Sequence, residues 1–157
     1  MTATRVRTLV ILLLAALVAT GIVQASAAQL NVRSNGSDGA AGTIHGAWVF
    51  TNRSNDACIL DGYPDLQLYG RGGRPLPTTV KKDLPPSPAQ VSLDPGDSAT
   101  FLSRYSDVPS GTQRCRPSAV LAITAPNSDA GLFIPASLEA CGGIVHVSAV
   151  EAGVHGP

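Results

Sequence analysis

The sequence predicts an all-β fold in which two antiparallel sheets pack face to face as a sandwich. Apolar and polar residues alternate with a period of two in several short segments, which is typical of strands that bury one face. The chain also holds 12 prolines and 16 glycines, which favour frequent turns. No long segment after residue 28 shows the period of a helix. A closed barrel fits the same pattern and stays open as the alternative.

The first 27 residues are typical of a secretory signal peptide. Two arginines precede an apolar run over residues 9–19, and a small-x-small pattern at residues 25–27 follows. These are the three parts of an export signal. We expect cleavage after Ala27, with Ala28 as the near alternative. An uncleaved membrane anchor is the competing interpretation, because residues 8–28 are just long enough to span a bilayer.

The signal peptide predicts a protein outside the cytoplasm, secreted or held at the cell envelope. The length that remains after the signal predicts a single domain. Removing 27 of the 157 residues leaves 130, with nine basic and eleven acidic side chains. That balance argues against a nucleic-acid partner, which requires a basic surface. We expect one β-domain over residues 28–152, a flexible tail over residues 153–157, a monomer, and membrane contact only through the signal peptide before cleavage.

The three cysteines predict one disulfide and one remaining thiol, as an odd count implies in an exported protein. We favour a Cys115–Cys141 bond, because both residues lie in loop sequence a few positions before a predicted strand. Cys58 then stays free as a small buried residue. A disulfide between Cys58 and another chain is the alternative.

The strands follow from the alternation. They are expected at residues 29–33, 43–52, 58–60, 65–69, 91–94 and 98–105, with more uniformly apolar strands at 119–125 and 144–150 and a short one at 132–134. The predicted core residues are Leu30, Val32, Trp48, Phe50, Leu66, Leu68, Val91, Leu93, Phe101, Leu121, Ile123, Val145 and Val147.

Turn residues separate these strands. Residues 94–97 read Asp-Pro-Gly-Asp, which is typical of a type II turn and predicts a hairpin between strands 91–94 and 98–105. Residues 61–64 and 71–74 predict two further tight turns. Residues 75–88 contain five prolines and are expected to form a stiff, extended loop rather than a strand.

Several motifs in one order resemble a known family. They are Phe-Thr-Asn at residues 50–52, Cys-Ile-Leu-Asp-Gly-Tyr-Pro at 58–64, Leu-Asp-Pro-Gly-Asp-Ser-Ala at 93–99, Cys115, and Cys-Gly-Gly at 141–143. The pattern resembles the secreted bacterial family called domain of unknown function 4232, over nearly all of the chain after the signal. The resemblance implies an immunoglobulin-like sandwich of exported proteins and lipoproteins, with no assigned activity. Family members usually carry a cysteine near the mature N-terminus as the partner of the one matching Cys58, and this chain has none there.

The residue types of catalysis and metal binding are present but are not arranged as sites. Ser98 follows a predicted turn without the flanking glycines of a hydrolase nucleophile. His45, His146 and His155 are widely separated, and no short His or Cys spacing suggests a metal. The aspartates lie in or beside turns, where their side chains commonly accept backbone hydrogen bonds. We therefore expect no catalytic residues, no metal and no cofactor.

Two surfaces are candidates for binding. The loop at 75–88, together with Arg71, Arg74, Lys81 and Lys82, predicts a locally basic edge that could meet an anionic envelope polymer or a protein partner. Tyr63, Tyr69 and Tyr105 could supply a face on which a sugar stacks.

The expected function is a non-enzymatic exported domain that binds an unidentified envelope component or protein. Two alternatives remain: a small exported hydrolase or carbohydrate-active enzyme, and a structural spacer without a ligand. A pocket with converging Asp, Glu, His or Ser side chains would favour the enzyme.

Overall fold

The computed structural model describes residues 24–157, so most of the predicted signal peptide lies outside the described residues. The described chain is all-β, as predicted. Its strands are β1 (Leu30–Ala40), β2 (Thr43–Asn52), β3 (Cys58–Asp61), β4 (Asp65–Tyr69), β5 (Thr79–Leu84), β6 (Gln90–Leu93), β7 (Ser98–Ser106), β8 (Val120–Thr124), β9 (Gly131–Pro135), β10 (Ile144–Ser148) and β11 (Glu151–Ala152). Two 3₁₀ turns, η1 (Arg71–Gly73) and η2 (Cys141–Gly143), are the helical elements of this part of the chain.

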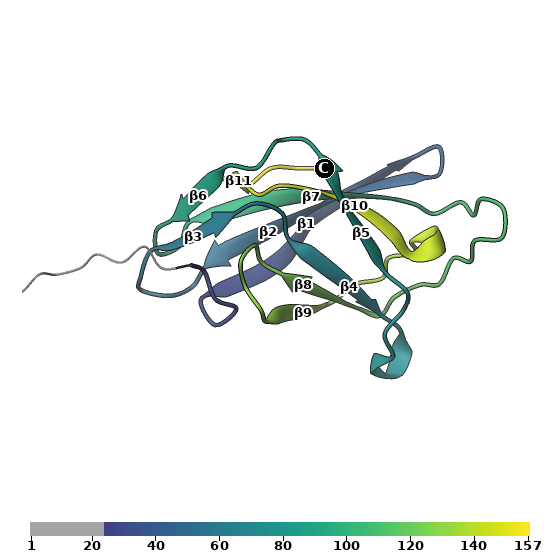
Figure 1. Ribbon diagram of the computed structural model, residues 1–157, viewed down its shortest axis with the longest axis horizontal. Coiled ribbons are helices and arrows are strands. Elements are labelled where there is room, and N and C mark those ends of the chain that lie inside the picture. The colour runs from purple at the N-terminus through teal and green to yellow at the C-terminus, as the bar shows by residue number, and fades with distance from the viewer. Residues whose placement is uncertain (1–23) are drawn as a thin grey trace, which may run out of the picture.

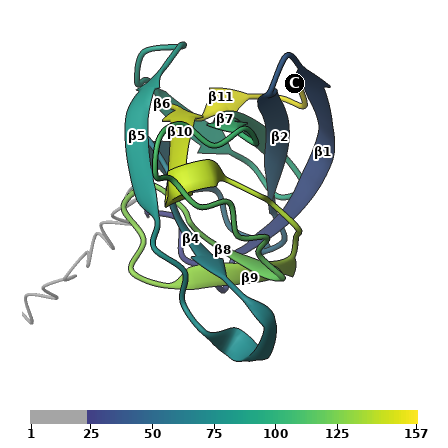
Figure 2. The ribbon, with the colours of Figure 1, turned by 90° about the vertical axis from the view of Figure 1, so that its right-hand side faces the viewer.

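The strands form two layers (Figure 1). One layer is a sheet in the order β1-β2-β7-β10-β5, with β11 also paired to β7. The pair β3-β6 and the three-stranded sheet β4-β8-β9 oppose it. Figure 2 shows the sheet β4-β8-β9 lying below the strands of the larger sheet. The arrangement is the predicted sandwich, and the pairing is antiparallel except between β5 and β10.

The core lies between the layers and is built from the side chains that alternation predicted. All thirteen predicted core residues are buried, and Phe50, Phe101, Leu121, Ile123, Val145 and Val147 are fully buried. The rings of Phe50 and Phe101 lie 5.5 Å apart between centroids, from neighbouring strands β2 and β7. Burial of such side chains contributes about 1.5–3 kcal/mol each, which makes this layer of contacts the main source of stability.

The predicted hairpin at residues 94–97 is wrong, although the turn itself forms. Asp97 donates its backbone N–H to the Asp94 carbonyl at 2.9 Å, and Gly96 has the positive φ of 89° that a type II turn needs. However, β6 pairs with β3 and β7 pairs with β2, so the chain crosses from one layer to the other. Local turn chemistry fixes the reversal but not the sheet that each arm joins.

Asn52 holds this crossing in place. Its side-chain amide donates to the carbonyls of Asp56 (2.8 Å) and Leu93 (3.0 Å), and its side-chain oxygen accepts from the N–H of Ser54 (3.0 Å). The backbone of Asn52 also bonds Gly96 and Asp97. The Asn52 side chain is 1 % exposed, and its buried polar atoms all have hydrogen-bond partners. It therefore joins the end of β2 to the loop after it and to the turn between the layers.

The predicted loop at 75–88 is only partly a loop. Its central, proline-free residues form β5, which pairs in parallel with β10 at the edge of the larger sheet. The five prolines lie before and after β5, outside the residues that pair with β10, so they cost no hydrogen bond between these strands. The loop prediction was wrong because the prolines lie at the two ends of the segment, and six residues between them are free to form a strand.

Both ends of the described chain contact the sandwich. Ala25 is 3 % exposed and donates its N–H to the Ile59 carbonyl at 3.0 Å, beside β3. At the other end, the tail predicted to be flexible is exposed but hydrogen-bonded. The N–H of His155 donates to Thr100 Oγ1 at 3.0 Å, and its carbonyl accepts from Asn35 at 2.8 Å.

Candidate functional site

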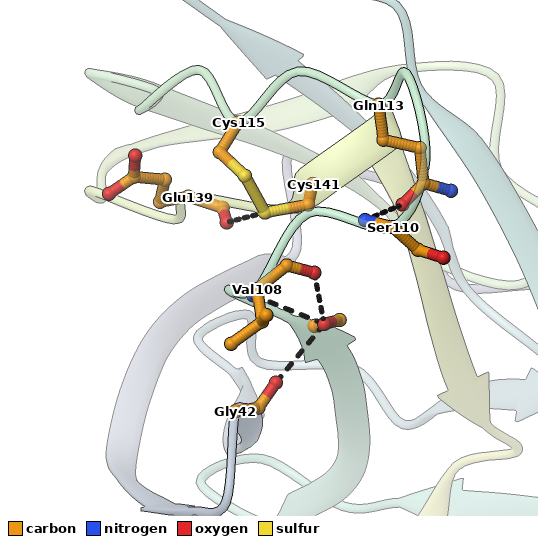
Figure 3. Close-up of a disulfide and its surroundings, with 8 residues drawn as sticks. Gly42, Val108, Ser110, Gln113, Cys115, Glu139 and Cys141 are labelled. Carbon is orange, nitrogen blue, oxygen red and sulfur yellow. Dashed lines mark hydrogen bonds between the residues drawn. A yellow bond between two sulfur atoms is a disulfide. The ribbon is translucent and has the colours of Figure 1, made fainter.

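The predicted disulfide is confirmed, and it organises one end of the sandwich. Cys115 and Cys141 are bonded, which ties the long loop after β7 to η2 (Figure 3). A backbone hydrogen bond from Gly142 to the Arg114 carbonyl, at 3.0 Å, supports the same contact. The loop carrying Arg114 and Arg116 is thereby held against the body of the domain.

Cys58 lies apart from this bond. It has no disulfide partner among the described residues and is 1 % exposed, packed into the core from β3. Burial raises the pKa of the Cys58 thiol above its usual value, because a thiolate would lose its hydration there. Cys58 therefore acts as a packed core residue and not as a reactive thiol.

The structure divides the four basic residues predicted to form one binding edge. Arg71 and Arg74 lie at the tip of the turn around η1, whereas Lys81 and Lys82 lie on β5, which leads away from that turn (Figure 1). Lys82 Nζ is 3.9 Å from a carboxylate oxygen of Asp65, so part of its charge is neutralised.

Arg71 and Arg74 are instead joined by two arginines that sequence reasoning did not select. Arg114 and Arg116 flank Cys115, and all four side chains are exposed. The two segments meet where Ala119 donates its N–H to the Tyr69 carbonyl at 2.7 Å. We call Arg71, Arg74, Arg114 and Arg116 the arginine-rich end.

The charge of the arginine-rich end is not balanced by nearby carboxylates. Within the described residues, none of its four guanidinium groups has a carboxylate oxygen within 4.0 Å, and none makes a side-chain hydrogen bond. Residues 66–82 and 108–128 contain no Asp or Glu, and Glu139, which precedes η2, has no basic group within 4.0 Å among the described residues. The arginine-rich end is thus a locally positive surface on a domain with nine basic and eleven acidic side chains after residue 27.

An apolar pocket of about 230 Å³ opens among these residues. Leu68, Leu76, Pro77 and Ala140 contribute apolar wall, and Arg114 and Arg116 lie at its side. The pocket exists because Leu76 pairs with Leu68 (N–H to carbonyl, 2.9 Å) and so brings the two legs of the η1 turn together. An anionic group bound by the arginines could place an adjoining apolar part in this pocket.

Of the three predicted tyrosines, Tyr69 lies next to this end. Its ring packs against Phe133 of β9, with centroids 5.9 Å apart, and Phe133 is 64 % exposed. The two rings lie on the outer face of the sheet β4-β8-β9, because each follows a residue that packs on the core, the buried Leu68 and the half-buried Leu132. Tyr63 and Tyr105 pack against the core instead, so the three tyrosines do not form one face.

The histidines and Ser98 are also separated. Ser98 Oγ lies 2.9 Å from Thr51 Oγ1 at the start of β7, a contact within the sheet. His45 and His146 lie on β2 and β10, and His155 lies in the tail. In the part of the chain that the structure describes, no three His, Cys, Asp or Glu side chains gather as metal ligands would. Among the same residues, no helix has the length and apolar character needed to cross a membrane.

Comparison with known families gives one match. A family model described as Domain of unknown function (DUF4232) covers residues 26–152. The chain belongs to this family. The resemblance inferred from the motifs is thereby confirmed, and the matched region ends at β11. No curated protein and no solved structure matches the chain.

Arg114 and Arg116 could have been found from sequence by a different signal. They belong to a stretch of 21 residues, 108–128, without an acidic side chain, next to a cysteine predicted to be bonded. The net charge of a stretch of about 20 residues indicates such a surface better than a pair of neighbouring lysines does. What the sequence does not contain is the contact between this loop and the η1 turn.

Proposed function

We propose that the protein is a non-enzymatic, exported domain that binds an anionic polymer of the cell envelope at its arginine-rich end. The observation that carries the proposal is the set of four exposed arginines, from two distant segments, that lack a carboxylate partner among the described residues. Arginine side chains suit carboxylate and phosphate groups, because the planar guanidinium can donate two parallel hydrogen bonds.

The aromatic pair supports a polymer built from sugar or polyol units. Tyr69 and Phe133 offer an exposed ring surface beside the arginines, and aromatic faces pack well against the apolar faces of sugar rings. Exposed single charges contribute little each, so affinity for such a polymer has to come from several contacts along its length. The disulfide and the family match are in keeping with an exported protein.

The test is retention of the purified exported protein on isolated bacterial cell envelopes. The doubles Arg71→Gln/Arg74→Gln and Arg114→Gln/Arg116→Gln should each reduce the bound fraction several-fold. Retention of the unaltered protein should also fall as salt is raised, since salt screens exposed charges. The matched control is Arg33→Gln/Arg53→Gln, which removes the same charge from exposed positions elsewhere.

Retention that survives both test doubles, or that falls equally in the control, would contradict the proposal. A parallel assay uses vesicles of anionic phospholipid. Binding to the vesicles together with no binding to envelopes would show that the ligand class is wrong.

One observation favours the enzymatic alternative. Asp83 lies 2.8 Å from His146 Nδ1, the contact by which a carboxylate orients a general base. His146 and Ser106 both line one cavity, but Ser106 Oγ is already bonded to the carbonyls of Gly42 (3.1 Å) and Val108 (2.9 Å). A nucleophile needs its base within hydrogen-bond reach, so the pair alone does not make an active site. Hydrolysis of an ester probe that is lost in His146→Gln would favour the enzyme.

A further inference from the structure

A row of basic side chains crosses the outer face of the larger sheet. His45 of β2 is the register partner of Arg104 of β7, Arg104 is the partner of His146 of β10, and His146 is the partner of Lys81 of β5. Register partners lie about 4.5–5.5 Å apart at Cα and point to the same face. Four neighbouring strands therefore place four basic groups side by side, which we call the basic row.

Carboxylates stand at two places along the row, since Asp38 of β1 is the register partner of His45 and Asp83 is bonded to His146. Like charges directly opposite one another on a sheet are destabilising, whereas opposite charges are stabilising. The middle of the row is Arg104, which is only partly exposed. Among the described residues it has no carboxylate within 4.0 Å. Asp83 is already engaged with His146, at 2.8 and 2.9 Å from Nδ1.

A cavity of about 210 Å³ lies over this part of the row. Its floor is the outer face of the sheet, where Thr43 and Ser106 are register partners next to Arg104 and His146. Tyr105, Ile144, the loop residue Gln113 and Cys141 of η2 also line the cavity. This volume exceeds that needed for a single water many times over, so it accommodates a small ion with part of its hydration.

The cavity contains hydrogen-bond donors that the rest of the chain does not use. The Arg104 guanidinium and the Thr43 hydroxyl make no hydrogen bond within the described residues. Gln113 accepts from the Ser110 N–H through its carbonyl oxygen, at 3.3 Å, which leaves its amide N–H groups free (Figure 3). The Asp83 contact on Nδ1 leaves Nε2 of His146 for another partner.

The disulfide lies at the loop side of this cavity. Gln113 lies two residues before Cys115, and Cys141 is itself part of the lining. The bond therefore fixes the loop amide over a sheet that carries the arginine. Proteins bind small oxyanions where hydrogen-bond donors are held in place around a partly buried positive side chain. The Gln113 amide and the Arg104 guanidinium have these two roles here.

We infer that this cavity binds a small oxyanion, a carboxylate or phosphate group, between the Arg104 guanidinium and the amide of Gln113. The site is distinct from the arginine-rich end, and it does not depend on the function proposed for that end. Opposing charges on neighbouring elements are Asp83, Asp107, Glu139 and Asp38, and the first is bonded to His146. The bound group neutralises the charge of Arg104, which lines the cavity.

The test is NMR titration of the exported protein with sodium phosphate and, separately, with sodium malonate. Sodium chloride at equal ionic strength is the reference. Saturable shifts of the Gln113 side-chain amide are expected at about millimolar concentration with phosphate or malonate and not with chloride. The response to the two salts distinguishes a phosphate from a carboxylate ligand.

The decisive variant is Arg104→Gln, which should weaken the binding at least tenfold. Arg33→Gln is the matched control, because Arg33 lies on β1 of the same sheet, and its guanidinium already donates to Asn35 at 2.8 Å. The control should leave the affinity unchanged. If Arg104→Gln does not fold, Arg104→Lys keeps the charge but loses the planar fork, and weaker binding is still expected.

Absence of saturable shifts overturns the inference, and so does equal binding by the protein and its Arg104 variant. The double Arg114→Gln/Arg116→Gln separates the two proposals. It should lose retention on envelopes while keeping phosphate or malonate binding. Loss of small-anion binding in that double would show that the ion sits at the arginine-rich end and not over Arg104.

Discussion

At the scale of single residues, burial decides what Cys58 can do. Its pKa is raised by desolvation, so the folded chain keeps the thiol proton at a pH where the unfolded chain, with a value of about 8.5, begins to lose it. The stability associated with the neutral thiol is therefore present below that value and is lost as the pH rises further. In the folded state, little thiolate exists to react or to bond another chain.

We accordingly expect Cys58 to resist an aromatic disulfide reagent at pH 8 until the protein is unfolded in denaturant. One thiol per chain should then react quickly. The exported protein should also migrate as a monomer in non-reducing electrophoresis. Rapid labelling of the native protein, or a dimer that a reductant removes, would show that the thiol is accessible.

Residue-level features were predictable where one local rule decides them. Alternation identified the buried side of the strands predicted at residues 29–33, 65–69 and 91–94, because a period of two assigns every second side chain to the core. The Cys115–Cys141 bond followed from loop sequence and an odd cysteine count. The importance of Arg114 and Arg116 did not follow, because it depends on the η1 turn lying beside their loop. That contact joins Tyr69 and Ala119, which are 50 positions apart in sequence.

At the scale of elements, sequence located strands better than it paired them. The turn at residues 94–97 forms as expected, but its two arms join opposite layers since Asn52 anchors the crossing. Strand β5 was missed because prolines surround it, and its partner β10 lies more than 60 residues away. Pairing is set by the tertiary contacts of both faces, which propensity and turn chemistry do not contain.

Gly143 gives a test of how β5 docks on β10. Its φ is +70°, and a Cβ at this position would overlap the carbonyl oxygen of Pro77, just before β5. Gly143→Ala should therefore lower the free energy of unfolding by about 3 kcal/mol or more, from backbone strain plus overpacking. Denaturant unfolding measures this.

The matched control is Gly72→Ala. Gly72 has a φ of +75° but open space around its Cβ position. That variant should cost only the backbone strain, about 1–2 kcal/mol. Equal losses in the two variants would mean that the close approach of Pro77 does not hold β5 in place.

At the scale of the whole molecule, the start of the chain bears on where an export signal would be cut. The predicted cleavage after Ala27 would remove Ala25, although Ala25 is buried and hydrogen-bonded to Ile59. A chain beginning at Ala28 should be about 1–2 kcal/mol less stable than one beginning at Gln24, from one lost hydrogen bond and a small apolar burial. Thermal unfolding of the two chains checks this, and equal melting temperatures would show that the segment adds nothing.

The central claim concerns the arginine-rich end as the surface that meets the envelope. The most direct measurement is amide NMR of the exported protein during titration with a soluble anionic polymer extracted from bacterial envelopes. We expect shifts concentrated at residues 68–77, 114–119 and 140–143, which fade as salt is added. Shifts centred on the opposite end, around the turn at 94–97, or no shifts at all, would contradict the account.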